Sequence, residues 1–200
     1  IKDHKISKEI EDKIIKKITL LAPKLDGIMI SDFVYGVITN KILESITKLS
    51  EQFGFKLYGD LQCSSQVGKV SKFSGFDLIT PTEKESRIAL EDNESGIEWI
   101  ANTLMNNTNS KNMLIKLGSD GFIAYGNTKS SIERQNFPAL VVNPVDVTGA
   151  GDSLFAAMSV SLSSGASLIE ASVIGVCMAS LAVKEVGNTA ITKEKLSNCI

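Results

Sequence analysis

Short apolar runs alternate with amphipathic segments along most of this 200-residue chain, and that alternation limits the folds it can adopt. The apolar runs are typical of buried strands, and the segments between them carry apolar residues at helical spacing. Strands that alternate with helices form a parallel sheet covered by helices on both faces. We therefore predict an α/β fold with a mostly parallel sheet, in a single domain over residues 1–200.

The positions of the predicted elements follow from this periodicity and from capping residues. Strands are expected over 27–32, 55–58, 76–80 and 112–117, the last forming a hairpin with 122–125. Helices are expected over 7–22, 39–53, 83–90, 94–106 and 149–164, then after Ser167 up to Gly187, and from 192 onward. The helix after Ser167 is apolar nearly all round, which predicts burial between layers. Residues 128–145 are β-like.

Polar residues follow each predicted strand. They are Ser31-Asp32, Asp60, 80–85, 118–121 and 146–152. The carboxyl ends of parallel strands meet at one edge of a sheet, and ligands of such sheets bind beyond that edge. We therefore expect these residues to lie along one edge and to form the functional site.

The segment Asp146-Val147-Thr148-Gly149-Ala150-Gly151-Asp152 stands directly before a helical pattern. A turn of small residues that opens a helix leaves backbone N–H groups unpaired, and with the helix dipole they form an anion site. Asp152 at the mouth of that site could take a proton from a hydroxyl that attacks a phosphate. The alternative is a Gly-rich turn with Asp152 as a simple N-cap. Spacing alone does not choose between the two.

Composition excludes several other classes of protein. The apolar fraction is 43% and the net charge is −2, which gives no indication of nucleic-acid or membrane binding. No apolar run approaches the ~20 residues of a membrane span, and we expect no signal peptide. Cys63, Cys177 and Cys199 show no metal-binding spacing, which favours free thiols in a reducing cytoplasm. His4 is the only histidine, which argues against Ser-His-Asp and Cys-His triads.

Asp-x-Thr-Gly-Ala-Gly-Asp ahead of an apolar helix resembles the C-terminal signature of the ribokinase-like (PfkB) carbohydrate kinases. The resemblance implies a three-layer ribokinase-like fold and transfer of the γ-phosphate of ATP to a hydroxyl of a sugar or sugar phosphate. It implies these roles: Asp152 as the catalytic base, the amides of Gly149, Ala150 and Gly151 as the anion hole, and Asp146 and Thr148 as holders of a monovalent cation such as K⁺.

Two further segments resemble nucleotide-binding parts of that family. Lys116-Leu117-Gly118-Ser119-Asp120-Gly121 is similar to its Gly-Ser-x-Gly loop, which implies that Lys116, Gly118, Ser119 and Gly121 bind ATP. Glycine allows close approach of the backbone to a ligand, but a plain hairpin turn is the alternative.

Thr80-Pro81-Thr82-Glu83-Lys84-Glu85 stands where the family has Asn-x-x-Glu. The resemblance implies that Glu85 organises Mg²⁺ near the phosphates. Thr82 occupies the Asn position, where its hydroxyl could donate to a phosphate, and this is a departure from the family pattern. The alternative is a helix start with surface carboxylates.

Within the family, Ser31-Asp32-Phe33-Val34-Tyr35-Gly36 and the tail 186–192 are most similar to bacterial heptose-7-phosphate kinases. The resemblance implies that Asp32 and Asp60 contact the sugar, while strand-end capping is the alternative. Those kinases carry Asp-Pro-Lys where this chain has Asp60-Leu61-Gln62, so the lysine expected for a phosphorylated sugar is missing.

Compared with the family, the sequence covers roughly the C-terminal two-thirds, starting at Ile1. We expect the N-terminal lid, its first strands and its Gly-Gly sugar signature to be missing, and the full-length chain could form a homodimer through that lid. Two functions follow: a sugar kinase, or a nucleotide-binding module that lacks activity because the sugar-binding part is absent. A purely structural α/β domain, with no response to ATP, is a third.

Overall fold

A six-stranded sheet forms the centre of the computed structural model, which describes residues 4–62, 70–127, 132–141, 143–187 and 189–199. In spatial order the strands are β1 (Gly27–Asp32), β2 (Lys56–Leu61), β3 (Leu78–Ile79), β4 (Asn112–Lys116), β5 (Phe122–Asn127) and β6 (Ile132–Phe137). The first four strands run parallel, and β5 and β6 are antiparallel to their neighbours. The predicted mostly parallel sheet and the predicted hairpin, formed by β4 and β5, are confirmed.

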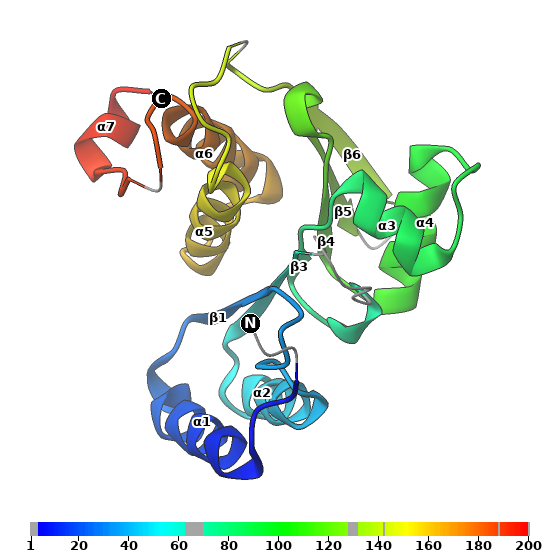
Figure 1. Cartoon of the computed structure of the whole chain (residues 1–200), viewed down its shortest axis with the longest axis vertical. Coiled ribbons are helices and arrows are strands. Elements are labelled where there is room, and N and C mark those ends of the chain that lie inside the picture. The colour runs from blue at the N-terminus through cyan, green and yellow to red at the C-terminus, as the bar shows by residue number, and fades with distance from the viewer. Residues whose placement is uncertain (1–3, 63–69, 128–131, 142, 188, 200) are drawn as a thin grey trace.

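Helices cover both faces of the sheet (Figure 1). They are α1 (Lys8–Leu21), α2 (Asn40–Phe53), α3 (Glu83–Leu90), α4 (Ile97–Thr108), α5 (Ala150–Ser163), α6 (Leu168–Ala182) and α7 (Lys193–Ser197), with short 3₁₀ turns η1 (Ala22–Lys24), η2 (Val70–Lys72) and η3 (Gly118–Asp120). One core lies between the sheet and α1, α2 and α4. A second core lies between the opposite face and α5 and α6. The predicted three-layer arrangement is therefore confirmed.

Side-chain caps fix where several helices begin. Ser7, Thr39, Thr82, Ser167 and Thr192 each accept a hydrogen bond from a backbone N–H in the first turn of the helix that follows. At α3 and α6 the N3 glutamate also returns a bond to the cap residue, completing a capping box. These are local signals, which is why the sequence predicted most helix starts to within a residue or two.

Several predicted boundaries differ from the structure. The strand predicted over 55–58 continues to Leu61, and the helix predicted to run up to Gly187 ends at Ala182. The helix predicted from residue 94 begins at Ile97, because the Asp92 carboxylate accepts the amides of Glu94 and Ser95 and holds them in a turn. The strand predicted over 76–80 is reduced to Leu78–Ile79, although Asp77 and Thr80 still donate backbone bonds to β2.

The predicted burial of α6 is only partly correct. Its inner face packs on α5, where a Cβ on Gly175 would stand only 2.6 Å from Leu154. Its outer face leaves Ile169 48% and Val173 43% exposed. Within the described residues α6 therefore forms an outer layer and is not enclosed between two others.

No helix in the described ranges is both long and apolar enough to cross a membrane. Cys177 and Cys199 are unpaired thiols, as expected, and Cys63 lies outside the described residues.

Candidate active site

Several of the polar residues that were predicted to share one edge lie together at the carboxyl ends of the parallel strands. Asp60 in β2 and Lys116 in β4 form an ion pair there, with 2.7 Å between Nζ and Oδ1. Thr80, which follows β3, donates its hydroxyl to the same carboxylate oxygen at 2.5 Å. Asp152 in the first turn of α5 accepts a hydrogen bond from Gln62, just beyond β2, at 2.9 Å. Four segments distant in sequence thus converge at the start of α5.

The start of α5 has the geometry that an anion site requires. Gly149 is the N-cap residue, with a left-handed φ of 77° and no side-chain cap. In the described part of the chain, the amides of Gly149, Gly151 and Asp152 donate to no other residue, whereas the Ala150 amide donates to the Val147 carbonyl at 3.3 Å. Three N–H groups and the positive end of the helix dipole are therefore available to an anion.

The Asp60–Lys116 ion pair is almost completely buried. Exposed side-chain fractions are 0% for Asp60 and 15% for Lys116. Burial raises the pKa of the Asp60 carboxyl, and Lys116 and Thr80 act in the opposite direction. Oδ2 of Asp60 is buried with no hydrogen-bond partner among the described residues. The ammonium group lies 3.9 Å from where a Cβ on Gly151 would stand, which places a cation beside the start of α5.

The other predicted sugar ligand, Asp32, is also buried, with 3% of its surface exposed. Its Oδ1 accepts the Val34 amide at 2.8 Å, and the Lys72 ammonium contacts Oδ2. Val34 has a φ of 63°, which is uncommon for a β-branched residue. Strand-end capping, which was the alternative to contact with a sugar, is thus present at Asp32.

Thr82 and Glu85 form the capping box of α3. Thr82 Oγ1 accepts the Glu85 amide at 3.1 Å, and Glu85 Oε2 accepts the Thr82 amide at 2.7 Å. Thr82 also bridges to Lys116 in the sheet, since the Lys116 amide donates to the Pro81 carbonyl at 2.9 Å. The helix-start alternative therefore describes this segment, and it brings Glu85 to the same edge as Lys116.

The predicted nucleotide loop is the turn between β4 and β5. Gly118 and Gly121 have φ values of 63° and 87°. A Cβ on Gly121 would stand 2.1 Å from the Phe137 carbonyl oxygen, so the hairpin itself requires glycine there. Gly118 has open space around it, and Ser119 is exposed. Close packing explains Gly121, whereas Gly118 leaves room for a ligand.

Asp146 ties two loops together. Its carboxylate accepts the Thr148 amide and the Gly187 amide, both at 2.9 Å. These two hydrogen bonds hold the pKa of Asp146 below its ordinary value. Together with Val183, whose carbonyl accepts the Val145 and Asp146 amides, this carboxylate fixes the approach to Gly149.

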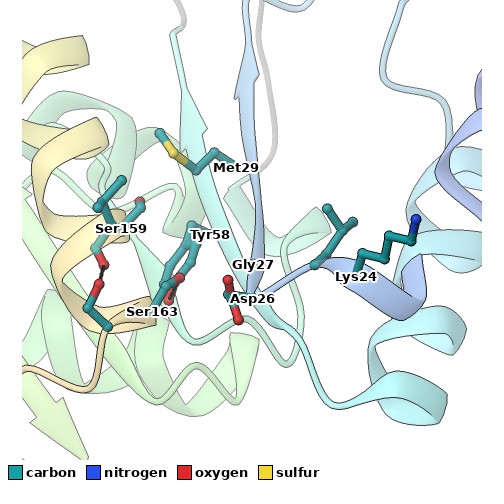
Figure 2. Close-up of a pocket in the computed structure, with 10 residues that line it drawn as sticks. Lys24, Asp26, Gly27, Met29, Tyr58, Ser159 and Ser163 are labelled. Atoms are coloured by element: carbon teal, nitrogen blue, oxygen red, sulfur yellow. Dashed lines mark hydrogen bonds between the residues drawn. The ribbon is translucent and has the colours of Figure 1, made fainter. Parts of the chain in front are cut away.

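A cavity of about 490 Å³ lies elsewhere, at the other end of α5. Figure 2 shows Tyr58, Ser159 and Ser163 beside Gly27 at the start of β1. Ser163 is eleven residues beyond Asp152, or ~16 Å along the helix axis. This cavity is therefore not part of the predicted site.

The fold is that of the ribokinase-like α/β kinases. The sequence matches the pfkB family carbohydrate kinases over residues 9–195, and the chain belongs to that family. The resemblance drawn from its motifs is confirmed.

Relatives and solved structures agree with this assignment. The chain is 27% identical over 191 residues to the bifunctional protein HldE of Geotalea uraniireducens, covering 94% of this chain and 37% of that protein. It is 28% identical over 202 residues to HldE of Desulfatibacillum aliphaticivorans, covering 97% and 40%.

The solved structures define the same fold. Phosphofructokinase-2 of Escherichia coli, with substrates and products, superposes with a TM-score of 0.79 at 18% identity, covering 98% of this chain and 62% of that one. Arabidopsis thaliana ribokinase, with ribose and ATP, gives 0.75 at 18% identity and the same coverage. The chain thus spans less than half of these relatives and under two-thirds of these structures.

Sequence reasoning missed the contacts that organise this edge. It singled out Asp60 and Lys116 separately and treated Gln62 only as a departure from a family pattern. One signal was available: Gln62 follows Asp60 by two positions at a strand end, a spacing that puts both side chains on the same side.

Proposed function

We propose that the chain is the nucleotide-binding and catalytic part of an ATP-dependent sugar kinase. The observation that carries the proposal is the start of α5, where unused backbone amides and the Asp152 carboxylate occupy one helical turn. Amides attract a phosphate and the carboxylate can accept a proton, so together they suit transfer of a phosphoryl group to a hydroxyl.

In the proposed reaction, the substrate hydroxyl oxygen attacks the γ-phosphorus of ATP in line. The new O–P bond forms as the bond to the β,γ-bridging oxygen breaks, ADP leaves, and the hydroxyl proton passes to Asp152. The amides of Gly149 and Gly151, with that of Asp152, would stabilise charge on the transferring group, where losing one donor costs ~2.7–4 kcal/mol of barrier. Ala150 would contribute only if its long bond to Val147 opens.

The nucleotide would lie along the strand ends, against Gly118 and Ser119, with Lys116 near its phosphates. Gly121 would act through the shape of the turn. Mg²⁺ would be held near Glu85, and the buried Oδ2 of Asp60, which has no hydrogen-bond partner within the described ranges, fits a cation at this edge. When bound, Mg²⁺ neutralises charge on the phosphates. Thr82 would reach a phosphate only through a hydroxyl that already caps α3.

Asp146 and Thr148 would hold a monovalent cation behind the anion site. Phosphofructokinase-2 of Escherichia coli, a structural neighbour, is known in complex with potassium. The partly used Asp146 carboxylate, between two backbone turns, is a suitable anionic ligand for such an ion. The ion would steady the turn that precedes Gly149.

The substrate would be a sugar or sugar phosphate at the edge formed by β1 and β2. Because Asp32 and Asp60 are buried, Asp32 would act on it mainly by positioning Lys72, and Asp60 by holding Lys116 where the phosphoryl group is transferred to it. We place the reaction in the reducing cytoplasm, where ATP is available, and a homodimer of the full-length protein is part of the same proposal.

The test is a phosphotransfer assay of the full-length protein against a panel of sugars and sugar phosphates. Asp152→Asn should lower kcat by ~10²–10⁴-fold and leave ATP binding, measured by calorimetry, nearly unchanged. Asp12→Asn, which changes an exposed carboxylate of α1 that pairs with Lys41 of α2, is the control and should keep wild-type turnover. Full turnover by Asp152→Asn would contradict the proposal, and ATP binding without transfer to any substrate would favour the inactive nucleotide-binding module.

A further inference from the structure

Gln62 connects the end of β2 to the proposed catalytic base. Its side-chain amide donates to Oδ1 of Asp152 at 2.9 Å across 90 residues of sequence. Its own backbone N–H donates to the Asp32 carbonyl at 2.9 Å, which continues the β1–β2 pairing beyond the strand ends. The side chain therefore projects from a fixed backbone, and it can impose an orientation on Asp152.

The end of β2 also holds the cation nearest to this contact, Lys116. Asp60, two residues before Gln62 on extended backbone, holds the Lys116 ammonium at 2.7 Å. That ammonium lies beside Gly151, the residue before Asp152. Without these two contacts, Lys116 and Asp152 could pair with each other. A carboxylate in such a pair is a weaker base, since a neighbouring positive charge disfavours its protonation.

We propose that Gln62 is a positioning residue for Asp152, a role that rests on the proposed kinase function. It fixes Oδ1 through a neutral donor and leaves Oδ2 to accept the proton from the substrate hydroxyl. Asp60 acts in parallel, because it retains Lys116 on the phosphate side. The end of β2 thus positions both the Asp152 base and the Lys116 cation, and it keeps these two groups from pairing with each other.

The neutral charge of Gln62 matters as much as its hydrogen bond to Asp152. A lysine there would reach the Asp152 carboxylate with a full positive charge, whereas glutamine orients the carboxylate without adding charge. Glutamine therefore suits a site in which Lys116 already supplies the cation.

Among the described residues, the other charged groups near this contact include Lys116 from β4, Asp60 from β2 and Glu85 from α3, which acts electrostatically on Asp60. They also include Asp32 at the end of β1, which pairs with Lys72 and whose carbonyl accepts the Gln62 amide. The Gln62 variants leave all of these residues unchanged, so a change in pH dependence can be assigned to the contact with Asp152.

The test is the pH profile of kcat and kcat/KM for the full-length protein with MgATP and its best sugar substrate. Gln62→Leu removes the donor, so we expect kcat to fall ~10- to 100-fold and the acidic limb to move up by about one pH unit, with the KM for ATP within about twofold. Gln62→Lys keeps a donor and adds charge, so its acidic limb should move to lower pH.

Gln52→Leu makes the same change on the exposed side of α2 and should reproduce the wild-type profile. Melting temperatures identify any variant that fails to fold, in which case the remaining Gln62 variant decides. Acidic limbs that stay at the wild-type pH, or that move in the same direction for Leu and Lys, would overturn the positioning role.

Asp152→Asn separates this inference from the proposed function. If Asp152→Asn is inactive and the Gln62 variants keep wild-type profiles, only the inference on Gln62 fails. If Asp152→Asn retains turnover, the base assignment fails and the inference fails with it.

Discussion

Lys116 Nζ lies 2.7 Å from Oδ1 of Asp60, and this ion pair joins β4 to β2 across the short strand between them. Thr80, which follows that short strand, donates to the same oxygen. One carboxylate oxygen therefore ties three strand ends together beneath α5. Burial, with a smaller effect from the Glu85 charge, raises the pKa of Asp60 even with these partners present, so the folded environment disfavours the charged carboxylate. The pair is better understood as fixing geometry than as adding stability.

A double-mutant cycle tests this interpretation. Asp60→Asn leaves the Lys116 ammonium buried without a counter-charge, and Lys116→Met leaves the Asp60 carboxylate in the same condition. Each single change should lower the free energy of unfolding by ~3–5 kcal/mol, and the double change should cost much less than their sum. Urea denaturation of the four proteins measures the coupling. Additive losses would show that the ion pair is not energetically linked.

The raised pKa of the Asp60 carboxyl also predicts the direction in which protein stability changes with pH. Because its pKa in the folded protein is raised above the ordinary value of 3.8, the folded state binds the proton more tightly than the unfolded state. The contribution of Asp60 to stability therefore declines as pH rises from that value through the folded pKa. The double variant should lack this decline, and an identical slope in wild type and double variant would contradict the assignment.

Gly149 and Gly151 should respond differently to alanine. Gly149 has a φ of 77°, so Gly149→Ala should destabilise the fold by ~1–2 kcal/mol. At Gly151 the nearest atom to a new Cβ is 3.9 Å away, so Gly151→Ala should leave stability unchanged or raise it by up to ~1 kcal/mol.

Kinetic measurements on Gly151→Ala distinguish the proposed phosphate-binding role of Gly151 from any role in packing. A methyl group there would stand 3.9 Å from the Lys116 ammonium, on the side proposed for the phosphates, so kcat/KM for ATP should fall roughly tenfold without loss of stability. Thermal unfolding and steady-state kinetics of each variant measure the two effects. A Gly151→Ala enzyme with wild-type kinetics would argue against phosphate binding at this turn.

Glu85 completes the capping box of α3, and it is also the residue proposed to organise Mg²⁺. Thr82→Ala removes the side-chain cap of α3 and should cost ~1 kcal/mol of stability. Glu85→Gln keeps an oxygen that can accept the Thr82 amide, so its stability should stay within ~0.5 kcal/mol of wild type. If Glu85 organises Mg²⁺, this variant should nevertheless need a higher Mg²⁺ concentration for half-maximal activity. An unchanged Mg²⁺ titration would leave Glu85 with the capping role alone.

The sequence predicted those features that depend on neighbouring residues. Caps such as Thr39 and Ser167 act over a few positions, and alternation of strands and helices determines a parallel sheet almost by itself. The boundary at Ile97 was misplaced because Asp92 forms a competing turn. The exposed side of α6 depends on what covers it, which hydrophobic periodicity does not specify.

The sequence predicted where the candidate site lies, but it did not predict which side chains contact one another there. Parallel strands bring their carboxyl ends together, so Asp60, Lys116 and Asp152 could be assigned to one edge. Which side chain meets which depends on register between elements far apart, 56 residues for Lys116 with Asp60 and 90 for Gln62 with Asp152. Small shifts of a strand or helix change such partners, so residue type and spacing do not determine them.

The Asp146 carboxylate holds the Thr148 and Gly187 amides, one on each oxygen. These bonds favour the charged carboxylate, so its pKa in the folded protein lies below the ordinary value of 3.8. The stability it contributes is therefore present above pH 3.8 and is lost as pH falls through the folded value. Asp146→Asn should be less stable than wild type at neutral pH, and the difference should shrink in acid as the wild-type carboxyl becomes protonated. Denaturant unfolding across this range checks the sign, because a constant difference would exclude the charged form as the cause. At neutral pH, the same variant should also lose any activation of the full-length enzyme by K⁺ relative to choline, if the carboxylate holds the proposed cation.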